Sequence, residues 1–433
     1  MTDPGAPGAA GAETRPEGRP RWHATGYQRR LLTVGLIGVG VAVVFGVPAF
    51  AVVAAAPLWL AFSASRKRPS RIEVSTDVDL RRCLEGDTVV VSSTATADAP
   101  VTFDAFLPCP LGLTIVDHAR HDDVRSRQAT YTWTLRADLW GRWPIGPIVV
   151  RAATDGLLAQ TTVSSGASKP LTVLPAASAL RQLPLPRTLP NRLGDHVSRV
   201  AGVGVEFAGI RPFVSGDQLR HLNWRATARY RRPYVTRFNA ERACELVIVV
   251  DGISDVGPHG SSSLDIAVRG AAALAQSYLA DHDRVGVIAM GGALHWVAGQ
   301  SGTTQFYRVV EALLDVRDFV SVVKPAVDRL PRAVLPAGSL VVMFSPLLDE
   351  RAIEVARDLR QRRFPLVVID VLAVEPRMSP PTRTSELAFR MWRLQRRATR
   401  SGLADLGVHV IDWNGRDSLD TALGALPMAG RIA

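Results

Sequence analysis

Charged and aromatic side chains alternate over residues 202–245, here called the signature segment, in an order that suits ion pairing. Arginine forms bidentate pairs with carboxylates and stacks on aromatic rings. Arg211 and Arg220 could therefore pair with Glu206 and Asp217, and Trp224 could cover these pairs. The alternating residues are Glu206, Phe207, Arg211, Phe213, Asp217, Arg220, Trp224 and Arg229.

The preferred interpretation of the signature segment is an internal clasp between the domains on either side of it. Arg211 and Asp217 are the favoured partners, because they bracket Pro212. Gly216 and Asp217 predict a turn or the cap of a short helix. Such a clasp would consist of buried charges.

A docking surface for an acidic partner is the second interpretation, and one segment could serve both purposes. Arg229, Arg231 and Arg232 are the favoured docking residues, because a core would not tolerate such crowded like charges unpaired. A nucleic-acid patch comes last, since the basic residues lack a recognised binding motif. We therefore expect no nucleic-acid partner.

The sequence contains no recognisable catalytic constellation. Gly202, Gly204 and Gly209 lack the spacing of a dinucleotide-binding loop, and Arg-Pro follows them in place of a helix start. We find no phosphate loop, paired-histidine zinc motif or nucleophile elbow. The three cysteines are too sparse for a disulfide framework or a metal site. We expect a protein that is not an enzyme and needs no cofactor.

A histidine and aspartate cluster offers a possible metal site in the N-terminal half. It consists of His118, His121, Asp122 and Asp123. A solvated polar loop is the preferred interpretation, because no further ligands are near in the sequence.

Alternating strand and helix patterns predict a doubly wound parallel sheet over residues 246–433. The first apolar run ends in Asp251 and is typical of a buried parallel strand. Ligands of such sheets bind at the carboxyl ends of the strands. Asp251 and the loop after it are therefore the candidate site of this domain.

A strongly basic helix is predicted over residues 385–404. Its apolar stripe consists of Leu387, Met391, Leu394 and Ala398, with five arginines largely off the stripe. We favour an ordinary surface helix packed on the sheet, and contact with anionic lipid is the alternative.

Short runs of β-branched and aromatic residues, separated by turn residues, predict a small antiparallel β-sandwich over residues 70–175. Their spacing favours an immunoglobulin-like type. Separate strands are expected over 88–96 and 101–107. Nothing in this region indicates catalysis.

The stretch 31–62 carries no charge, and Gly46-Val47-Pro48 interrupts it near its middle. This pattern predicts a transmembrane or re-entrant helical hairpin over residues 31–65. One end is flanked by Arg29 and Arg30, and the other by Arg66, Lys67, Arg68 and Arg71. The positive-inside rule therefore places both ends in the cytoplasm. A cleaved export signal ending near 61–65 is the less favoured alternative, because the apolar stretch is too long.

The chain as a whole is basic, and its first residues are polar. Residues 1–30 are expected to be a disordered tail. Lys+Arg is 51 against 40 Asp+Glu, so the formal net charge of the 433-residue chain is +11. This excess favours an anionic partner, and anionic membrane lipids are one candidate.

The signature segment, residues 195–245 in its widest extent, resembles the bacterial family called domain of unknown function 58. The motif Gly-x-Glu-Phe-x-Gly-x-Arg-Pro-aromatic is followed by Gly-Asp-x-x-Arg-x-x-x-Trp-x-x-x-Ala-Arg. The residues in step with it are Gly204, Glu206, Phe207, Gly209, Arg211, Pro212, Phe213, Gly216, Asp217, Arg220, Trp224, Ala228 and Arg229.

The resemblance implies a von Willebrand factor A-like fold for residues 246–433. Members of that superfamily often hold a divalent metal through Asp-x-Ser-x-Ser at the first strand end. Here Asp251, Ser254 and Asp255 are present, but Ile253 stands where the first serine is expected. We therefore interpret the site as degraded, and Mg²⁺ binding is possible but not favoured.

The resemblance also implies a functional link to an AAA+ ATPase of the MoxR type. We expect a non-enzymatic adaptor in the cell membrane, with its soluble domains in the cytoplasm. Together with the ATPase it would assemble, mature or remodel unknown client proteins at the cell envelope. The alternative is a metal-dependent adhesion or binding module displayed at the cell surface.

Overall fold

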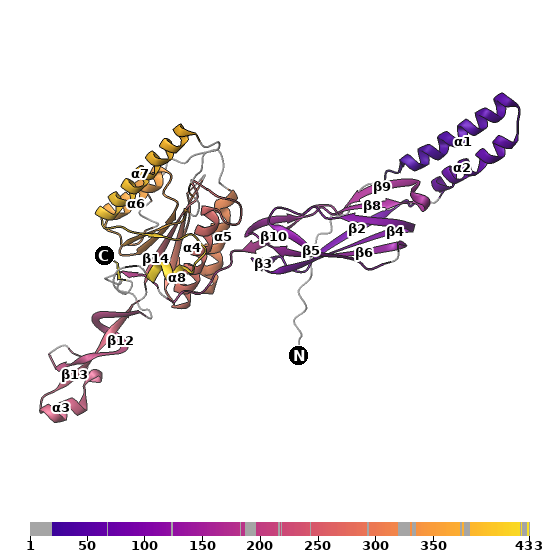
Figure 1. Cartoon of the computed structure of the whole chain (residues 1–433). Helices are drawn as coiled ribbons and strands as arrows, with labels where there is room; N and C mark the ends of the chain where they lie inside the picture. Colours follow the sequence, from indigo (N-terminus) through magenta and orange to yellow (C-terminus); the bar gives the residue numbers. More distant parts are fainter. Residues whose placement is uncertain are drawn as a thin grey trace, which may run out of the picture. The chain divides into compact units, whose positions relative to one another are not determined.

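The computed structural model describes residues 20–66, 68–122, 124–181, 183–186, 196–214, 217, 219–242, 244–291, 294–318, 330, 335–372, 375, 382–424, 426 and 431–432. The chain divides into two compact units, Met1–Leu174 and Pro175–Ala433 (Figure 1). Each unit is described by itself.

Unit 1 begins with two apolar helices, α1 (Gly26–Phe45) and α2 (Ala49–Arg66). Thr25 caps α1, because its hydroxyl accepts a hydrogen bond from the Gln28 amide at 3.2 Å. Gly46 ends α1 with φ +66°, a left-handed conformation that glycine adopts without strain. Pro48 follows in the turn that separates the helices.

The predicted tail over residues 1–30 is wrong for its last part. Residues 23–24 form the short strand β1 (His23–Ala24), and α1 already begins at Gly26. Arg29 and Arg30 therefore lie in the first turns of α1, and do not precede it. Residues 1–19 are outside the described part of the chain.

The two helices pack antiparallel through small residues. A Cβ added at Gly38 would lie 2.8 Å from the Ala54 Cβ, so these positions allow close approach. Gln28 is buried and donates from Nε2 to the Ala61 carbonyl at 2.9 Å. The other faces expose Val34, Leu36, Ile37, Val43, Val44, Phe45, Phe50, Val52, Val53, Trp59 and Phe62.

Helix α1 is long and apolar enough to cross a membrane. Its 20 residues correspond to about 30 Å, the thickness of a hydrocarbon core. The apolar part of α2, Ala49–Ser63, is shorter. Of the two predicted membrane-spanning helices, α1 is therefore long enough to cross the bilayer, and the described apolar part of α2 is shorter.

The rest of unit 1 forms two β-sheets. The larger has the order β1-β9-β8-β4-β6-β5 with β2 paired to β4, and the smaller has the order β3-β10-β7. The strands are β2 (Ile72–Val78), β3 (Arg82–Leu84), β4 (Thr88–Phe106), β5 (Leu113–Arg120), β6 (Arg125–Ala137), β7 (Gly141–Ile145), β8 (Val149–Ala153), β9 (Ala159–Ser164) and β10 (Lys169–Leu174), with a 3₁₀ turn η1 (Asp155–Leu157).

Both sheets contribute to one apolar core. Phe103 and Trp133 of the larger sheet and Leu171 of the smaller are each at most 2% exposed and belong to one cluster. The two predicted strands over 88–96 and 101–107 are one long strand, β4, whose pairing with β6 shifts register between Thr96 and Val101. A bulge of this kind lets one strand bend and continue.

Unit 2 contains a six-stranded sheet with the order β16-β15-β14-β17-β18-β19. Strand β16 is antiparallel to its neighbour at one edge, and the other strands are parallel. The bounds are β14 (Glu245–Asp251), β15 (Arg284–Met290), β16 (Leu294–Gln300), β17 (Leu340–Ser345), β18 (Leu366–Asp370) and β19 (His409–Asp412).

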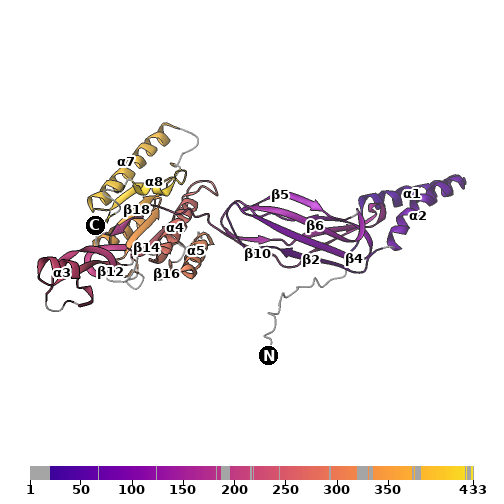
Figure 2. The same ribbon diagram turned by 90° about the horizontal axis from the view of Figure 1, so that it is seen from below.

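Helices cover both faces of this sheet, as Figure 2 shows. Phe344 points toward α4, because a Cβ at Gly270 would lie 2.5 Å from its ring. Met343, one residue earlier, clusters with Val355 of α6, so α4 and α6 lie on opposite faces. The helices are α4 (Ser263–Ala280), α5 (Thr303–Asp318), α6 (Glu350–Gln361), α7 (Arg383–Asp405) and α8 (Leu419–Gly424).

The signature segment forms an antiparallel hairpin of β12 (His196–Pro212) and β13 (Tyr234–Arg242). The connection between these strands contains a 3₁₀ turn, η2 (Leu219–His221), and the short helix α3 (Trp224–Tyr230). Separately, β11 (Leu185–Pro186) pairs with β20 (Arg431–Ile432) near the end of the chain.

Candidate functional site

Strand β14 ends in Asp251 at the topological switch point of the sheet. The strands that follow β14 in the chain, β15 and β16, lie on one side of it, and β17, β18 and β19 lie on the other. Strands β14 and β17 are neighbours there, and ligands of doubly wound sheets bind at such a point. The Ser345 hydroxyl donates to Asp251 Oδ2 at 2.6 Å, and the Ile253 amide donates to Oδ1 at 3.0 Å. Asp251 is 1% exposed, and burial raises its pKa to about 6.

Asp255, in the loop after β14, binds the first residues of helix α4. Asp255 is exposed, and its Oδ1 accepts hydrogen bonds from the Leu264 amide at 3.0 Å and the Ser263 hydroxyl at 3.2 Å. Ser254, which lies between the two aspartates in the sequence, is half-buried. Asp255 therefore holds the amino end of α4.

The side chains of this loop do not fit the ligand set of a divalent cation held by an Asp-x-Ser-x-Ser motif. Both Asp251 oxygens accept protein hydrogen bonds, Asp255 is occupied at α4, and Ile253 offers no side-chain oxygen. Within the residues that the structure describes, no three His, Cys, Asp or Glu side chains gather where they could hold a metal. The hydrogen bonds of Asp251 and Asp255 therefore give both carboxylates a structural role.

The histidine and aspartate cluster of unit 1 makes ordinary protein contacts. The His118 ring lies 5.8 Å from the Trp133 ring, and His121 Nε2 is 2.8 Å from Thr132 Oγ1. Asp122 Oδ2 accepts the Thr130 amide at 2.5 Å. Asp123 is outside the described residues.

An ion-pair network at the ends of β18 and β19, buried at Asp370 and exposed at Asp412, was missed by sequence reasoning. Arg396 of α7 donates from Nη2 to Asp370 Oδ1 and Oδ2 at 2.6 and 2.5 Å. Arg400 forms two bonds to Asp412, at 2.6 and 2.7 Å, and lies 3.4 Å from Asp370. Burial raises the pKa of Asp370, although Arg396 opposes this shift.

A signal for this network exists in the sequence. Two apolar strands each end in aspartate, Asp370 and Asp412, and two arginines stand four residues apart on the helix between them. Residues at i and i+4 share one helix face, so Arg396 and Arg400 reach the same sheet edge. Arg396 also donates to the Pro346 carbonyl at 2.7 Å.

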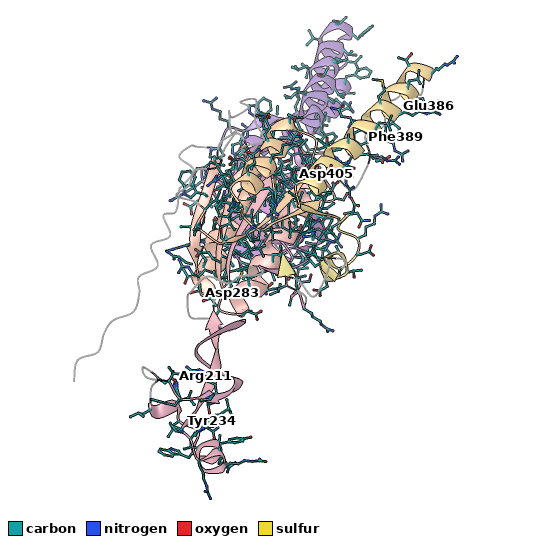
Figure 3. All side chains as sticks on the ribbon, turned by 90° about the vertical axis from the view of Figure 1, so that its left-hand side faces the viewer. Arg211, Tyr234, Asp283, Glu386, Phe389 and Asp405 are labelled. Atoms are coloured by element: carbon teal, nitrogen blue, oxygen red, sulfur yellow. The ribbon has the colours of Figure 1, made fainter. Side chains whose placement is uncertain are left out.

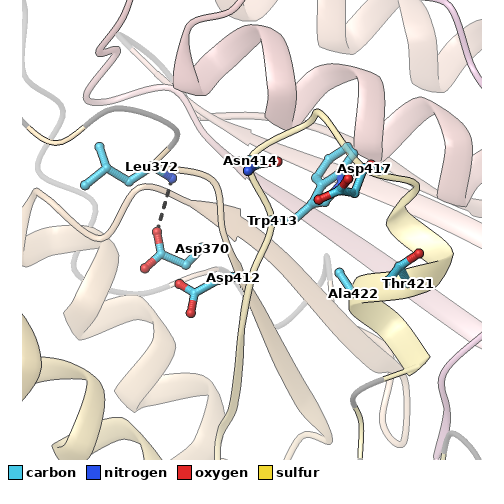
Figure 4. A pocket seen from close by; sticks show the side chains of 8 residues that line it. All are labelled: Asp370, Leu372, Asp412, Trp413, Asn414, Asp417, Thr421 and Ala422. Carbon is cyan, nitrogen blue, oxygen red and sulfur yellow. Dashed lines mark hydrogen bonds between the residues drawn. The ribbon is translucent and has the colours of Figure 1, made fainter.

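A small pocket of about 200 Å³ opens beside this network (Figure 4). Its wall combines carboxylates with Trp413, Asn414 and Thr421. Asp370 and Asp412 in the wall already pair with arginines, and the Leu372 amide donates to Asp370 Oδ1 at 3.2 Å. The pocket therefore belongs to the structural network that fastens α7.

Arg211 and Asp217 do form a pair, but it is neither buried nor between domains. Arg211 Nη1 and Nη2 donate to the Asp217 carboxylate at 2.7 and 2.6 Å. The two side chains are 37% and 20% exposed, and the residues are six apart, Arg211 at the end of β12 and Asp217 in the turn after it. The predicted buried clasp is wrong, because Arg211 on β12 and Asp217 in the turn after it belong to the same hairpin. Figure 3 labels Arg211 on this hairpin.

The same carboxylate shapes the turn that follows β12. Asp217 Oδ2 accepts the Val214 amide at 2.8 Å, and Arg211 Nη1 donates to the Pro212 carbonyl at 3.0 Å. The bond to Asp217 raises the pKa of the Arg211 guanidinium further. Asp217 therefore closes a turn.

The connection of the hairpin, residues 213–233, is held together by its own bonds; we call it the tip. Asn223 caps α3 by accepting the Ala226 amide at 3.0 Å, and its Nδ2 donates to Thr236 at 3.1 Å. The Thr227 hydroxyl accepts the Tyr234 amide at 3.0 Å. Ala226 of α3 and Val235 of β13 are both buried. These bonds fix α3 against β13.

The outer surface of the tip is basic and aromatic. Trp224 is 73% exposed, so it does not cover the Arg211–Asp217 pair as predicted. Tyr230 is also exposed, and the Arg229 guanidinium lies 5.9 Å from its ring centre. Among the exposed residues here are Leu219, Trp224, Arg225, Arg229, Tyr230, Arg231 and Arg232.

The remaining signature residues are only partly described. Glu206, Phe207 and Gly209 lie on β12, and the side chains of Glu206 and Phe207 are outside the description. Arg220 lies in η2 with an undescribed side chain, and Gly216 is outside the described residues. The predicted pairs of Glu206 and Arg220 therefore stay predictions.

The signature region matches a known family. Residues 209–382 match the model of a family described as "Protein of unknown function DUF58". This match confirms the family resemblance of the sequence over the tip and much of the α/β sheet.

Three uncharacterized mycobacterial proteins are similar to part of the chain. One is from Mycobacterium bovis and two are from strains of Mycobacterium tuberculosis, each 30% identical over 179 residues. The aligned part is 39% of this chain and 56% of each relative. The chain thus spans about half the length of the curated relatives that it matches.

Proposed function

We propose, from the premise that the chain belongs to the DUF58 family through residues 209–382, that it is a membrane-anchored, non-enzymatic adaptor. The apolar side chains exposed along α1 and α2 support the anchor, since water would disfavour so large an apolar surface. Arg29 and Arg30 in the first turns of α1, together with Arg68 and Arg71 after α2, favour cytoplasmic soluble units.

Two finer fold assignments belong to this proposal. The strand order of unit 2, with one antiparallel edge strand and Asp251 at the reversal point, supports a von Willebrand factor A-like domain. The two packed sheets of unit 1 support an immunoglobulin-like sandwich. A metal-dependent adhesion module receives no support from the loop after β14, because its carboxylates already accept protein donors.

The observation that carries the adaptor proposal is the exposed basic and aromatic surface of the tip. Arg225, Arg229, Arg231 and Arg232 are exposed around Trp224 and Tyr230. Aromatic residues and arginine are enriched at the energetically dominant positions of protein interfaces. Because internal bonds fix α3 in place, binding would order few groups in the tip itself. The surface therefore suits an acidic face of a partner protein.

The proposed partner is an AAA+ ATPase of the MoxR type, the association that the family resemblance implies. The ATPase would supply the energy, and this chain would hold it at the membrane near client proteins of the cell envelope. Steering between opposite charges would speed their encounter and would weaken with added salt.

The test is capture of the ATPase by the purified full chain in mild detergent, with the double variant Arg231→Ala/Arg232→Ala compared with wild type. We expect capture by wild type, several-fold weaker capture by the double variant, and loss with salt. The matched control Arg308→Ala/Arg357→Ala removes two exposed charges from α5 and α6. Equal capture by wild type and the double variant, or equal losses in both variants, would refute docking by the tip.

A further inference from the structure

Helix α7 exposes the face that its sequence pattern marks as apolar. Leu387, Met391 and Leu394 are 53%, 71% and 64% exposed, and Ala398 beside them is also exposed. A stripe of this kind normally packs against a core. In Figure 3 the outer part of α7, from Glu386 past Phe389, extends away from the sheet with side chains on its free side.

The opposite face of α7 explains this outward orientation. Leu403 is fully buried, and Arg396 and Arg400 bind Asp370 and Asp412 at the sheet edge. These ion pairs fix the rotation of the helix about its axis. The apolar stripe lies on the other side of that axis, so it must face outward.

Positive charge borders the exposed stripe. Arg383, Arg390 and Arg397 follow one another at seven-residue intervals, which places them along one side of the stripe. Arg390 pairs with Glu386 at 3.0 Å, and both side chains are about two-thirds exposed. Within the described part of the chain, Arg383 and Arg397 have no acidic partner, so the border keeps a net positive charge.

We infer that the outer face of α7 binds the surface of an anionic lipid bilayer and lies in its interfacial plane. The stripe from Leu387 to Ala398 is about 16 Å long, and the arginine stems can reach headgroups while the leucines enter the acyl boundary. Charge complementarity favours anionic over neutral lipid.

A bilayer fits this face better than a second copy of the chain. A second copy would bring an equally basic border against this one, and like charges would repel. The inference rests on the proposed membrane anchor in one respect: the anchor keeps α7 close to the bilayer, so a weak intrinsic affinity is sufficient.

The experiment places a fluorescent probe on the stripe of the full chain. Leu394→Cys is labelled in a Cys109→Ser background, because Cys109 is the exposed cysteine while Cys83 and Cys244 are buried. The labelled chain is reconstituted into nanodiscs of phosphatidylcholine alone or with phosphatidylglycerol, each also containing a lipid quencher. We expect strong quenching with the anionic lipid and little with the neutral one.

A charge variant tests the border of the stripe. Arg390→Gln/Arg397→Gln should weaken the equilibrium between α7 and the anionic surface by about 25-fold, at roughly five-fold for each arginine. The matched control Arg308→Gln/Arg357→Gln lowers the net charge equally on α5 and α6 and should leave quenching unchanged. Equal loss in both variants would overturn the inference.

Other outcomes also decide the inference. Absence of quenching in anionic nanodiscs overturns it. Shielding of the probe in detergent that increases with protein concentration also overturns it, because such shielding indicates that a second copy of the chain covers the stripe. Co-elution of the chain with the nanodisc reports the anchor separately. If the chain fails to enter the nanodisc, quenching by added anionic vesicles still decides whether α7 binds lipid.

Discussion

Two arginine–aspartate pairs in unit 2 join the same charged groups in opposite surroundings. Arg396 and Asp370 are 13% and 2% exposed and join residues 26 apart in the chain. Arg211 and Asp217 are 37% and 20% exposed and are six residues apart, at the end of β12 and in the turn after it. Arg211 donates from both terminal nitrogens and Arg396 from Nη2 alone, but the distances are nearly equal, so distance does not distinguish the roles of the two pairs.

Burial determines what each pair can do. The Asp370 carboxylate has lost most of its water, so its arginine is required to hold α7 on the sheet. The Arg211 pair remains hydrated and shapes a turn, while the neighbouring arginines of the tip stay available to a partner. The comparison predicts a graded series of stability effects, which three variants can test.

The largest effect is expected for Arg396→Ala, which leaves Asp370 buried without its main partner. The free energy of unfolding should fall by about 3–5 kcal/mol, toward the lower end because Arg400 remains 3.4 Å from Asp370. Denaturant unfolding of the full chain in mild detergent measures this change. The control Arg393→Ala removes a 48% exposed arginine from the same helix and should cost far less.

The second effect concerns Asp251, a buried carboxylate that accepts from a hydroxyl and an amide and not from an arginine. Burial raises the pKa of Asp251 from 3.8 to about 6, so the folded chain binds a proton that the unfolded chain releases. Stability should therefore fall as the pH rises from about 4 to 6, by up to about 3 kcal/mol.

Asp251→Asn tests this pH dependence because it removes the ionisable group. Relative to wild type, the variant should gain stability as the pH rises from about 4 to 7, whatever its fixed cost from the altered bond to Ser345. Denaturant midpoints of both proteins across this pH range measure the difference. Parallel profiles would contradict the buried titration of Asp251.

The spacing of apolar residues predicted where the helices and strands of unit 2 lie in the sequence, but not which face of α7 points outward. The apolar run before Asp251 is strand β14, and the basic helix predicted over 385–404 is α7, Arg383–Asp405. The outward stripe of α7 could not be predicted, because its rotation depends on Asp370 and Asp412. Those two carboxylates meet Arg396 and Arg400 only after the parallel strands align.

The candidate sites show the same division between local and long-range information. The pairing of Arg211 with Asp217 was predictable, because six residues and a turn bring the two together. Its exposure and that of Trp224 were not, because burial depends on what the rest of the chain places above them. Asp255 is likewise a candidate metal ligand by its position in the sequence, and only the fold shows that it holds the amino end of α4.

The smallest stability effect is expected for Arg211→Ala. Water can replace the guanidinium at an exposed carboxylate, and Asp217 keeps its bond from the Val214 amide at 2.8 Å. The melting temperature should change much less than in Arg396→Ala, measured side by side in the same detergent. Partner capture should fall only to the extent that the tip loses its shape, and less than in Arg231→Ala/Arg232→Ala. A loss of stability as large as that of Arg396→Ala would show that the Arg211 pair is buried in the working molecule, and the contrast between the two pairs would fail.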